Sequence, residues 1–328
     1  MPTRTIADLG ERALVHRITT RLATPSWVVV GPGDDAAVVE PERGSLEVLT
    51  TDTQVEGIHF DQGFVAPDAI GHRSLAVNLS DLAAMGARPR AALLSLVLPD
   101  ALEVAVFDGL LDGMLALAEA HRIAVIGGNI SRSPGPLVVD VMATGTVRRR
   151  RILTRAGARP GDAVYVTGAI GDALVGLKSL QRGGSQALVE QERRYLRPEP
   201  RVRTGLVLAG NRAASACMDL SDGLADAARQ IAEASHVGIT LDAGLLPIND
   251  AVRRWHEDEG RDAVMCALES GEDYELLFTA SKTARVPNRI MGVRVTPIGE
   301  ITRRKGMFLV NDGVRCKLEP RGWEHFRH

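Results

Sequence analysis

The chain alternates single apolar strands with long helical segments, and this order limits the folds open to it more than any other feature. Residues 27–30 and 46–52 are short apolar runs, and residues 69–85 carry a helical pattern that stops at Gly86. The other segments expected in this half are helices at 6–22 and 102–121 and strands at 92–98, 123–128 and 136–147. Single strands separated by helices indicate a mixed α/β (α+β) architecture.

A basic stretch with glycine and proline at 148–162 divides the sequence. Such a composition is typical of an exposed connection between domains. The pattern of strands and helices restarts after it, with a polar region at 181–200 and expected elements at 163–168, 171–180, 215–234, 238–242, 274–279 and 294–299. We therefore predict two domains, residues 1–148 and residues 149–328.

The composition argues against several classes of partner. The net charge of −2 and the pI near 6.5 give no electrostatic reason to expect nucleic acid or an anionic membrane. Aromatic residues make up 4% of the chain, too few to suggest stacking platforms for single strands. The longest apolar stretch, 91–107, is interrupted by Pro99, Asp100 and Glu103, so we expect no membrane span.

The cysteines and the first residues favour a cytoplasmic protein. Cys217, Cys266 and Cys316 are odd in number and far apart, which fits neither a zinc site nor a disulfide framework. Reduced thiols of this kind are usual in the cytoplasm. Residues 1–18 contain no apolar core of a signal peptide.

Carboxylates recur at the ends of strands and the starts of helices, among glycine, serine, threonine or asparagine. They are Asp35, Asp52, Asp81, Asp219 and Asp222. Each of them alone is explained equally well as a helix cap or a turn residue. If they converge, however, two charges 4 Å apart cost roughly 4 kcal/mol at an effective dielectric constant of 20. Magnesium ions relieve such repulsion and commonly bridge carboxylates to the phosphates of a substrate.

Other phosphate-binding patterns are weaker. Residues 171–179 approach a P-loop, but Leu177 displaces the lysine by one position, so a P-loop is rejected. Gly127, Gly128 and Asn129 follow an apolar run and form either an anion-binding nest or a plain turn. The basic run 148–151 is expected to be solvated. Arg155 stands apart from it, between Thr154 and a glycine turn, and its guanidinium could bind phosphate oxygens from there.

Several motifs, taken in order, resemble the thiamine-monophosphate kinase family. They are "GDDAAVV", "TTDTQVEGIHF", "AVNLSDLAAMGA", "LTRAGARPGD", "VTGAIGDALVGL", "DLSDGLADAA", "SGEDYELLFT" and "GWEHF", which span about residues 31–327. "GDDAA" or "SDG" alone would indicate only the wider superfamily of aminoimidazole ribonucleotide synthetase, hydrogenase maturation dehydratase and selenophosphate synthetase. "VEGIHF" together with "GEDYELLF" points to the thiamine branch.

The resemblance implies a function and an assembly. Members transfer the γ-phosphoryl group of ATP directly to thiamine monophosphate, with several Mg²⁺ ions and without a covalent intermediate on the protein. We therefore expect no catalytic nucleophile, because phosphoryl transfer needs mainly positioning and charge neutralisation. The family also implies a homodimer in which N-terminal strands of both chains build a barrel-like sheet, beside a C-terminal α/β domain.

The resemblance also implies roles for individual residues. Those matching metal ligands are Asp35, Thr50, Thr51, Asp52, Asp81, Asp219 and Asp222. Those matching ATP contacts are Gly128, Asn129, Arg155 and Ser221, and those matching substrate contacts are His59, Glu272 and Trp323. Glu272 can offer charge or a hydrogen bond to the cationic thiamine, and Trp323 an aromatic face. On spacing alone, His59 is explained as well by a structural role and Glu272 by a polar turn.

Two alternatives remain beside the kinase. The first is another ATP-using member of the superfamily, of the hydrogenase maturation or purine synthetase type. A selenophosphate synthetase would need a reactive cysteine near the N-terminus, and a hydrogenase maturation dehydratase one at the extreme C-terminus. The first cysteine here is Cys217 and the chain ends in "EHFRH", which disfavours both. The second alternative is a non-catalytic protein that binds nucleotides or thiamine phosphates.

Asn129 departs from the family pattern and generates a prediction. The family has Gly-Gly-Asp-Thr, with the aspartate as a metal ligand, where this chain has Gly-Gly-Asn-Ile at 127–130. Asparagine keeps an oxygen donor but loses the charge. We expect weakened affinity for one Mg²⁺, with activity retained at millimolar metal. In a magnesium titration of activity, Asn129→Asp should move the curve to lower concentrations; superimposable curves would contradict this.

Overall fold

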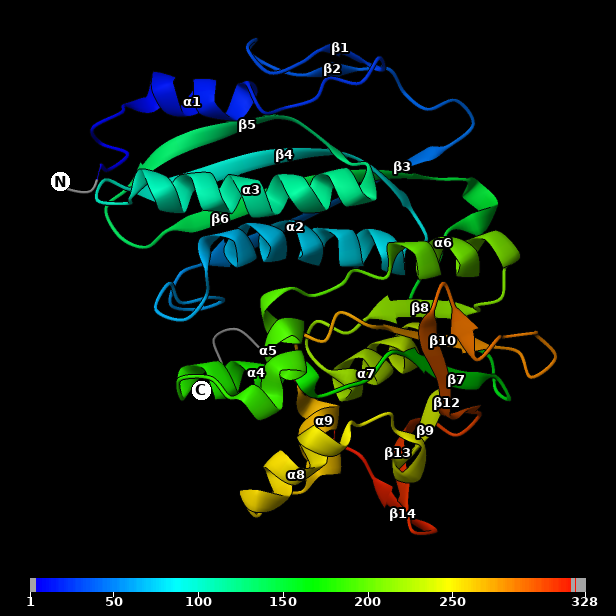
Figure 1. Cartoon of the computed structure of the whole chain (residues 1–328). Coiled ribbons are helices and arrows are strands. Elements are labelled where there is room, and N and C mark those ends of the chain that lie inside the picture. Colours follow the sequence, from blue (N-terminus) through cyan, green and yellow to red (C-terminus); the bar gives the residue numbers. More distant parts are fainter. Residues whose placement is uncertain (1–3, 320–321, 323–328) are drawn as a thin grey trace. The chain divides into compact units, whose positions relative to one another are not determined.

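The computed structural model describes residues 4–319 and Gly322. The chain forms two compact units. The first contains the residues up to Leu82 together with Arg88–Arg149, and the second contains Ala83–Ala87 and the chain from Arg150 onward. Both units combine helices with β-sheet, which confirms the predicted mixed α/β class (Figure 1). In the described residues, no helix has the length and apolar character needed to cross a membrane.

The first unit is built on a four-stranded sheet. Its strand order is β3 (Leu46–Val55), β6 (Val138–Val147), β4 (Arg88–Pro99) and β5 (Ala124–Ser133). Neighbouring strands are antiparallel except β4 and β5, which are parallel. Burial alternates along β4 and β6, because successive side chains of a strand point to opposite faces. Leu94 and Val141 are buried, whereas Leu93 and Asp140 lie on a more open face.

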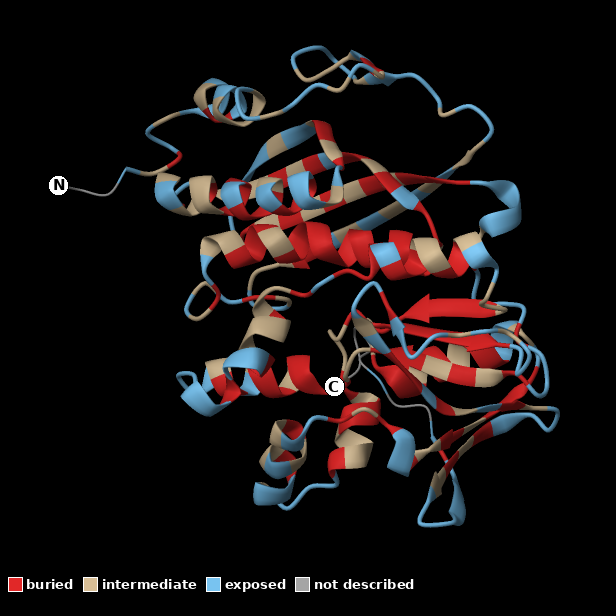
Figure 2. Cartoon of the chain, turned by 45° about the vertical axis from the view of Figure 1, so that its right-hand side comes forward, coloured by how far each residue is buried: buried red, intermediate tan, exposed pale blue. Residues whose placement is uncertain are grey.

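Two helices lie along one face of this sheet, α2 (Pro67–Ala84) and α3 (Val104–His121) (Figure 1). Figure 2 shows α2 buried along almost its whole length. The two helices approach each other closely through glycine. A Cβ atom added to Gly113 would lie 1.8 Å from the carbonyl oxygen of Asp68, and one added to Gly71 would lie 1.8 Å from that of Leu110. These two positions therefore fix how closely α2 and α3 pack.

An N-terminal segment contains α1 (Glu11–Thr19), β1 (Val28–Val30) and β2 (Val38–Val39). The helix is shorter than the predicted 6–22, because Ile6 is bonded through its N–H to the carbonyl of Leu102 and Gly10 precedes the helix with a φ of 76°. The strand β1 is anchored to the sheet by Val28, which packs with Ala91 and Ile126.

The second unit contains a larger mixed sheet. Its order is β14 (Val314–Lys317), β13 (Gly306–Asn311), β9 (Gly238–Asp242), β12 (Val293–Thr302), β7 (Ala163–Thr167), β10 (Leu276–Ala280) and β8 (Ala216–Asp219), with β11 (Arg289–Ile290) paired to β12. The helices are α4 (Asp172–Gln181), α5 (Val189–Leu196), α6 (Val202–Asn211), α7 (Leu224–Ala234), α8 (Asp250–Asp258) and α9 (Ala263–Glu269). Val164, Ile231 and Leu277 are fully buried members of its core.

The predicted strands and long helices are present, but the polar region 181–200 contains α5, a helix not expected there. Of its eight residues only Gln191 and Tyr195 are buried, one helical turn apart. Its charged residues form ion pairs instead, including Glu190 with Arg193 at 2.8 Å. A helix with so narrow a buried stripe, in which Gln191 is itself polar, gives little periodic hydrophobic signal in the sequence.

The close approach of α2 and α3 predicts a cost for any side chain at Gly113. In Gly113→Ala the new methyl group would collide with backbone, which cannot rotate away as a flexible side chain can, so the helices must separate. We expect a loss of about 1–3 kcal/mol of stability, seen as a lower thermal unfolding midpoint. Gly210→Ala in α6 is the matched control, because no atom lies within 4 Å of its added Cβ. Equal midpoints for the two variants would contradict the packing described.

Candidate functional site

A polar layer lies between β3 and α2 in the first unit. The hydroxyl of Thr50 donates a hydrogen bond to the Asp81 carboxylate, and Asp52 follows Thr50 on the same face of β3. Asn78 on α2 and Gln54 on β3 are buried, and their side-chain oxygens have no hydrogen-bond partner in the described structure. Carboxylate, hydroxyl and amide oxygens together form a donor set suited to a hard cation such as Mg²⁺.

This donor set requires further ligands. Among the residues described, no three histidine, cysteine, aspartate or glutamate side chains are grouped so as to hold a metal ion. That is the usual situation for Mg²⁺, which takes one or two carboxylates and completes its shell with water and substrate phosphates. Thr51 is separated from its neighbours Thr50 and Asp52, because it points to the opposite face of β3.

A cavity of about 1080 Å³ lies in the first unit, lined by the N-terminal segment and the open face of the sheet. Asp34, Asp35, Gly128 and Asn129 contribute to its wall. Asp34 accepts a hydrogen bond from the N–H of Asp35 at 2.8 Å and so closes its own turn. The Asp35 carboxylate carries no such local bond in the described residues, which leaves its oxygens available to a ligand.

Gly127, Gly128 and Asn129 are neither a turn nor a nest, and both interpretations of this segment were wrong. They lie inside β5, opposite Leu93, Leu94 and Ser95 of β4, next to an irregularity in register. A Cβ on Gly128 would lie 1.9 Å from the carbonyl oxygen of Leu94, so close backbone approach requires glycine here. Asn129 donates a hydrogen bond to the Ser131 hydroxyl at 3.0 Å.

Asp140 is a wall residue of the same cavity that the sequence patterns did not single out. It lies in β6 and accepts hydrogen bonds from the hydroxyls of Thr51 at 3.3 Å and Thr53 at 2.5 Å. The available signal was a single acidic residue within an otherwise apolar strand, "PLVVDVMATG". Such a residue stands at no strand end or helix start, so the junction pattern missed it.

His59 lies in the turn that follows β3. Its Nδ1 atom accepts a hydrogen bond from the N–H of Val55 at 3.1 Å, which fixes the ring near the end of that strand. The side chain remains partly exposed. The geometry is therefore compatible with a ring held in place while one edge faces a ligand.

In the second unit, two loops bring four of the predicted residues together. The N–H of Glu272 donates to the carbonyl of Ser221 at 2.7 Å, and the N–H of Tyr274 donates to that of Leu220 at 2.9 Å. Asp219, at the end of β8, and Asp222 therefore lie beside the loop that carries Glu272. Neither Asp219 nor Ser221 caps α7, whose N-cap is Gly223 without a side-chain hydrogen bond.

The loop with Glu272 has a tightly constrained backbone. Glu272 and Tyr274 have φ angles of 71° and 48°, which are uncommon for residues other than glycine. Gly271 leaves no room for a side chain, since its Cβ would lie 2.5 Å from the Ser221 carbonyl oxygen. Gly322 makes an equally close approach to the Asp222 carbonyl oxygen, whereas Trp323 lies outside the described residues.

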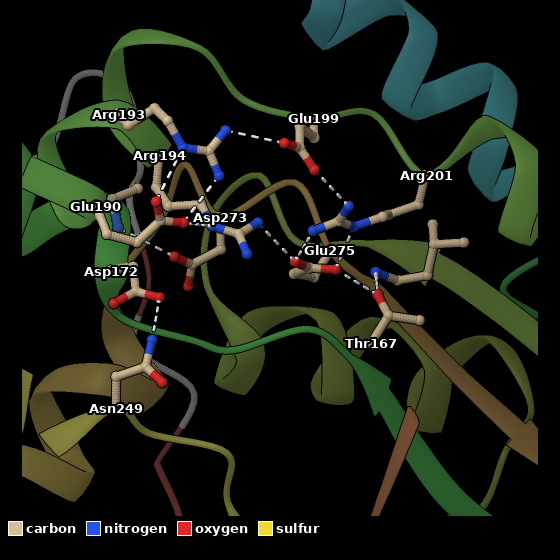
Figure 3. A network of polar contacts seen from close by, with 12 residues as sticks. Thr167, Asp172, Glu190, Arg193, Arg194, Glu199, Arg201, Asn249, Asp273 and Glu275 are labelled. Carbon is tan, nitrogen blue, oxygen red and sulfur yellow. Dashed lines mark hydrogen bonds and ion pairs between the residues drawn. The ribbon is translucent and has the colours of Figure 1, made fainter. Parts of the chain in front are cut away.

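A buried ion pair supports this loop (Figure 3). Glu275 is fully buried and receives two hydrogen bonds from the guanidinium of Arg201, one of them from Nε at 2.6 Å. The Thr167 hydroxyl donates to the same carboxylate at 2.6 Å and accepts from the N–H of Leu276 at 2.8 Å. These bonds fix the start of β10, and with it the end of the loop.

Asp273, the residue after Glu272, supports the start of α4. Its carboxylate accepts hydrogen bonds from the N–H groups of Gly171 at 2.8 Å and Ala173 at 3.3 Å. The pKa of Asp273 is raised well above its ordinary value, because removal from water outweighs these two donors and the charges of Asp172 and Glu275 add to the effect. The Asp273 carboxylate therefore has a structural role at the start of α4.

Arg155 and two of the cysteines have surroundings that define their roles. Arg155 donates a hydrogen bond to the side chain of Gln230 on α7 at 2.5 Å. Burial raises the pKa of the Cys217 and Cys266 thiols. Raised pKa values leave both as thiols, which makes them poor nucleophiles.

Comparison with known proteins agrees with this architecture. The AIR synthase related protein, N-terminal domain, matches residues 33–147, and the AIR synthase related protein, C-terminal domain, matches residues 159–311. The chain is thus a two-domain protein of the AIR synthase related class. Thiamine-monophosphate kinase of Escherichia coli (strain K12) is 39% identical over 328 residues, covering 97% of this chain and 98% of that protein. The chain belongs to the thiamine-monophosphate kinase family.

Solved structures show the same relationship. The crystal structure of thiamine-monophosphate kinase from Stenotrophomonas maltophilia K279a is 40% identical, with a TM-score of 0.81 over 92% of this chain and 96% of that chain. The structure of AaThiL complexed with AMPPCP and TMP is 35% identical, with a TM-score of 0.79 over 99% of this chain and all of that one.

The buried pair beneath the Glu272 loop predicts a large effect on stability. In Glu275→Gln the buried Arg201 guanidinium loses its buried countercharge and keeps only the more exposed Glu199 at 3.1 Å, so we expect a loss of about 3 kcal/mol in the free energy of unfolding. Urea denaturation measures this. Glu259→Gln removes a carboxylate paired with the exposed Arg182 and should leave stability unchanged. A Glu275→Gln protein as stable as this control would show that the pair does not support the fold.

Proposed function

We propose that this protein transfers the γ-phosphoryl group of ATP to thiamine monophosphate and releases thiamine diphosphate and ADP. One observation carries the proposal: a relative complexed with AMPPCP and TMP covers 99% of this chain at 35% identity. The carboxylates of both units provide the further support, since a transfer between two anionic phosphates requires groups that hold cations.

The polar layer of the first unit is proposed to hold Mg²⁺ through Asp52, Asp81 and Thr50. Asp35, which lines the cavity, and Thr51, on the opposite face of β3, are proposed as ligands of further Mg²⁺. Mg²⁺, when bound, neutralises charge on the reacting phosphates. In the second unit Asp219 and Asp222 hold further Mg²⁺, and Ser221 contacts the nucleotide from the loop between them. Gly128, Asn129 and Arg155 are proposed as further ATP contacts.

The thiamine substrate is proposed to meet His59, Glu272 and Trp323. The constrained backbone around Glu272 holds its carboxylate in one position, which favours recognition of the positively charged thiazolium ring. The hydrogen bond that Nδ1 of His59 accepts from the N–H of Val55 fixes the orientation of its ring. The chain's own groups thus bind and orient the reactants, and none of them needs to act as a nucleophile.

A homodimer is part of the proposal. The sheet of the first unit ends in β3 and β5, two long strands each paired on one side only within the described chain. Leu49 and Leu93 are exposed on its open face. Unpaired edges and an apolar face favour association with another copy, in which strands of both chains would form a barrel-like sheet. We further propose a cytoplasmic location, with no nucleic acid or membrane partner.

The test is a direct assay. The protein is incubated with ATP, Mg²⁺ and thiamine monophosphate, and thiamine diphosphate is measured by thiochrome fluorescence after separation. We expect product in proportion to ADP. Absence of thiamine diphosphate, with ADP formed from another acceptor, would overturn the proposal.

A residue-level prediction follows from the polar layer. Asp81→Asn removes the charge that Thr50 orients, so turnover should fall by about 100-fold or more while the unfolding midpoint stays close to wild type. Asp112→Asn is the control, because Asp112 is an exposed helical carboxylate on α3 that pairs only with Arg21 in the described structure. Near-normal turnover of the Asp81 variant would make that residue purely structural.

A further inference from the structure

We propose that the second unit carries an anion site that binds a phosphate group, either free phosphate or the phosphate of a small ester. The site is a cavity of about 500 Å³ formed by the loop after β7, the end of α5 and the segment after it, the loop before α8, and the hairpin of β11 and β12. Its described wall contains none of Asp219, Ser221, Asp222 and Glu272. The inference therefore does not depend on the proposed kinase activity.

Guanidinium groups dominate the wall of this cavity. Its charged residues within the described chain are four arginines and one glutamate, namely Arg194, Arg201, Arg289, Arg294 and Glu199. Arginine suits the planar, bidentate recognition of phosphate oxygens and stays charged at every physiological pH. The composition of the wall thus favours an oxyanion over a cation or an uncharged ligand.

Two of these arginines, Arg194 and Arg201, are held in place by a buried carboxylate. Arg201 donates from Nε to Glu275 at 2.6 Å, and Arg194 donates to the same carboxylate at 3.4 Å (Figure 3). Further bonds join Arg201 to Glu199 at 3.1 Å and Arg194 to Glu190 at 3.2 Å. These bonds engage only some of the five N–H groups of each guanidinium, so further donors are held in fixed positions beside the cavity.

The other two arginines lie directly opposite each other in the hairpin. Arg289 of β11 pairs with Arg294 of β12, so their side chains share one face of the two-stranded ribbon. Like charges in this arrangement repel each other. The guanidinium of Arg289 donates to the carbonyl of Gly292 at 3.0 Å, and no carboxylate pairs with either arginine in the described part of the chain. A bound anion would relieve this repulsion.

The charge balance indicates which anion fits. The ion-paired network around Glu275 contains three guanidinium groups and three carboxylates and is neutral: Arg193, Arg194, Arg201, Glu190, Glu199 and Glu275. The hairpin adds two positive charges, those of Arg289 and Arg294. A phosphate monoester carries about −1.5 to −2 charges at pH 7, which matches this surplus.

The hairpin is fixed relative to the inner arginines. The N–H of Gly168 donates to the carbonyl of Arg294 at 2.9 Å and so ties the end of β7 to the start of β12. The two-residue loop of Met291 and Gly292 has φ angles of 52° and 86°, and type I′ hairpin turns require positive values at both positions. A Cβ on Gly168 would lie 1.9 Å from a carboxylate oxygen of Glu275, so glycine is required there. Groups fixed in advance lose less entropy when a ligand binds.

Phosphate binding without metal tests the site. Isothermal titration calorimetry with inorganic phosphate is run on the full chain in EDTA, because the proposed transfer site holds phosphates through Mg²⁺ and the arginine cavity does not. We expect one phosphate per chain in wild type and an affinity weaker by about tenfold or more in Arg289→Gln/Arg294→Gln. A second titration uses glycerol phosphate: tighter binding than inorganic phosphate identifies an ester as the ligand class, and weaker binding identifies the free ion.

Arg303→Gln/Arg304→Gln is the matched control, since it removes two exposed arginines of the same unit that lie outside the cavity wall. Its phosphate affinity should equal that of wild type, and a similar loss in both double variants would reduce the effect to net charge and overturn the inference. In phosphate-free buffer, the cavity variant should unfold at a midpoint no lower than the control, because it loses two opposed like charges. A lower midpoint with unchanged phosphate affinity would make these arginines purely structural. Wild-type protein that binds no phosphate in EDTA would also overturn the inference.

Discussion

Burial of only one face of the four-stranded sheet determines where polar groups of the first unit can lie. One set of alternating side chains packs under α2 and α3, where Leu94 and Val141 exclude water. The other set, which includes Asp140 and Thr51, faces the cavity. Since the alternation has a period of two, consecutive residues of the "TTD" motif are divided between the two faces. A one-residue slip of β3 would exchange Thr50 and Asp52 with Thr51 and Thr53.

In the second unit the predicted carboxylates lie at the end of a strand and on loops: Asp219 ends β8, and Asp222 and Glu272 lie on loops. Backbone hydrogen bonds between residues 220–221 and 272–274 hold the two loops in register. Positive φ angles at Glu272 and Tyr274 store strain, and such strain persists only where the surroundings fix the backbone. The buried ion pair of Glu275 with Arg201 helps to fix this backbone, because Glu275 directly follows Tyr274. A buried pair is a poor source of net stability, so its value here lies in fixing the position of Glu272.

Much of the fold was predictable from local patterns. Apolar runs and helical spacing are properties of neighbouring residues, so they can be read without knowing the tertiary contacts. The junction pattern singled out Asp52 and Asp81, but the structure places Asp52 inside β3, which runs further than the predicted strand, and Asp81 inside α2. Gly127 and Gly128 were misassigned because a glycine pair after an apolar run also suits a turn. Gly128 is required by the carbonyl of Leu94, and Gly127 lies close to the side chain of Leu93; both contacts come from the neighbouring strand, which is distant in sequence. Asp140 was missed for the same reason, since its hydrogen-bond partners Thr51 and Thr53 lie on another strand and not among its neighbours in the chain.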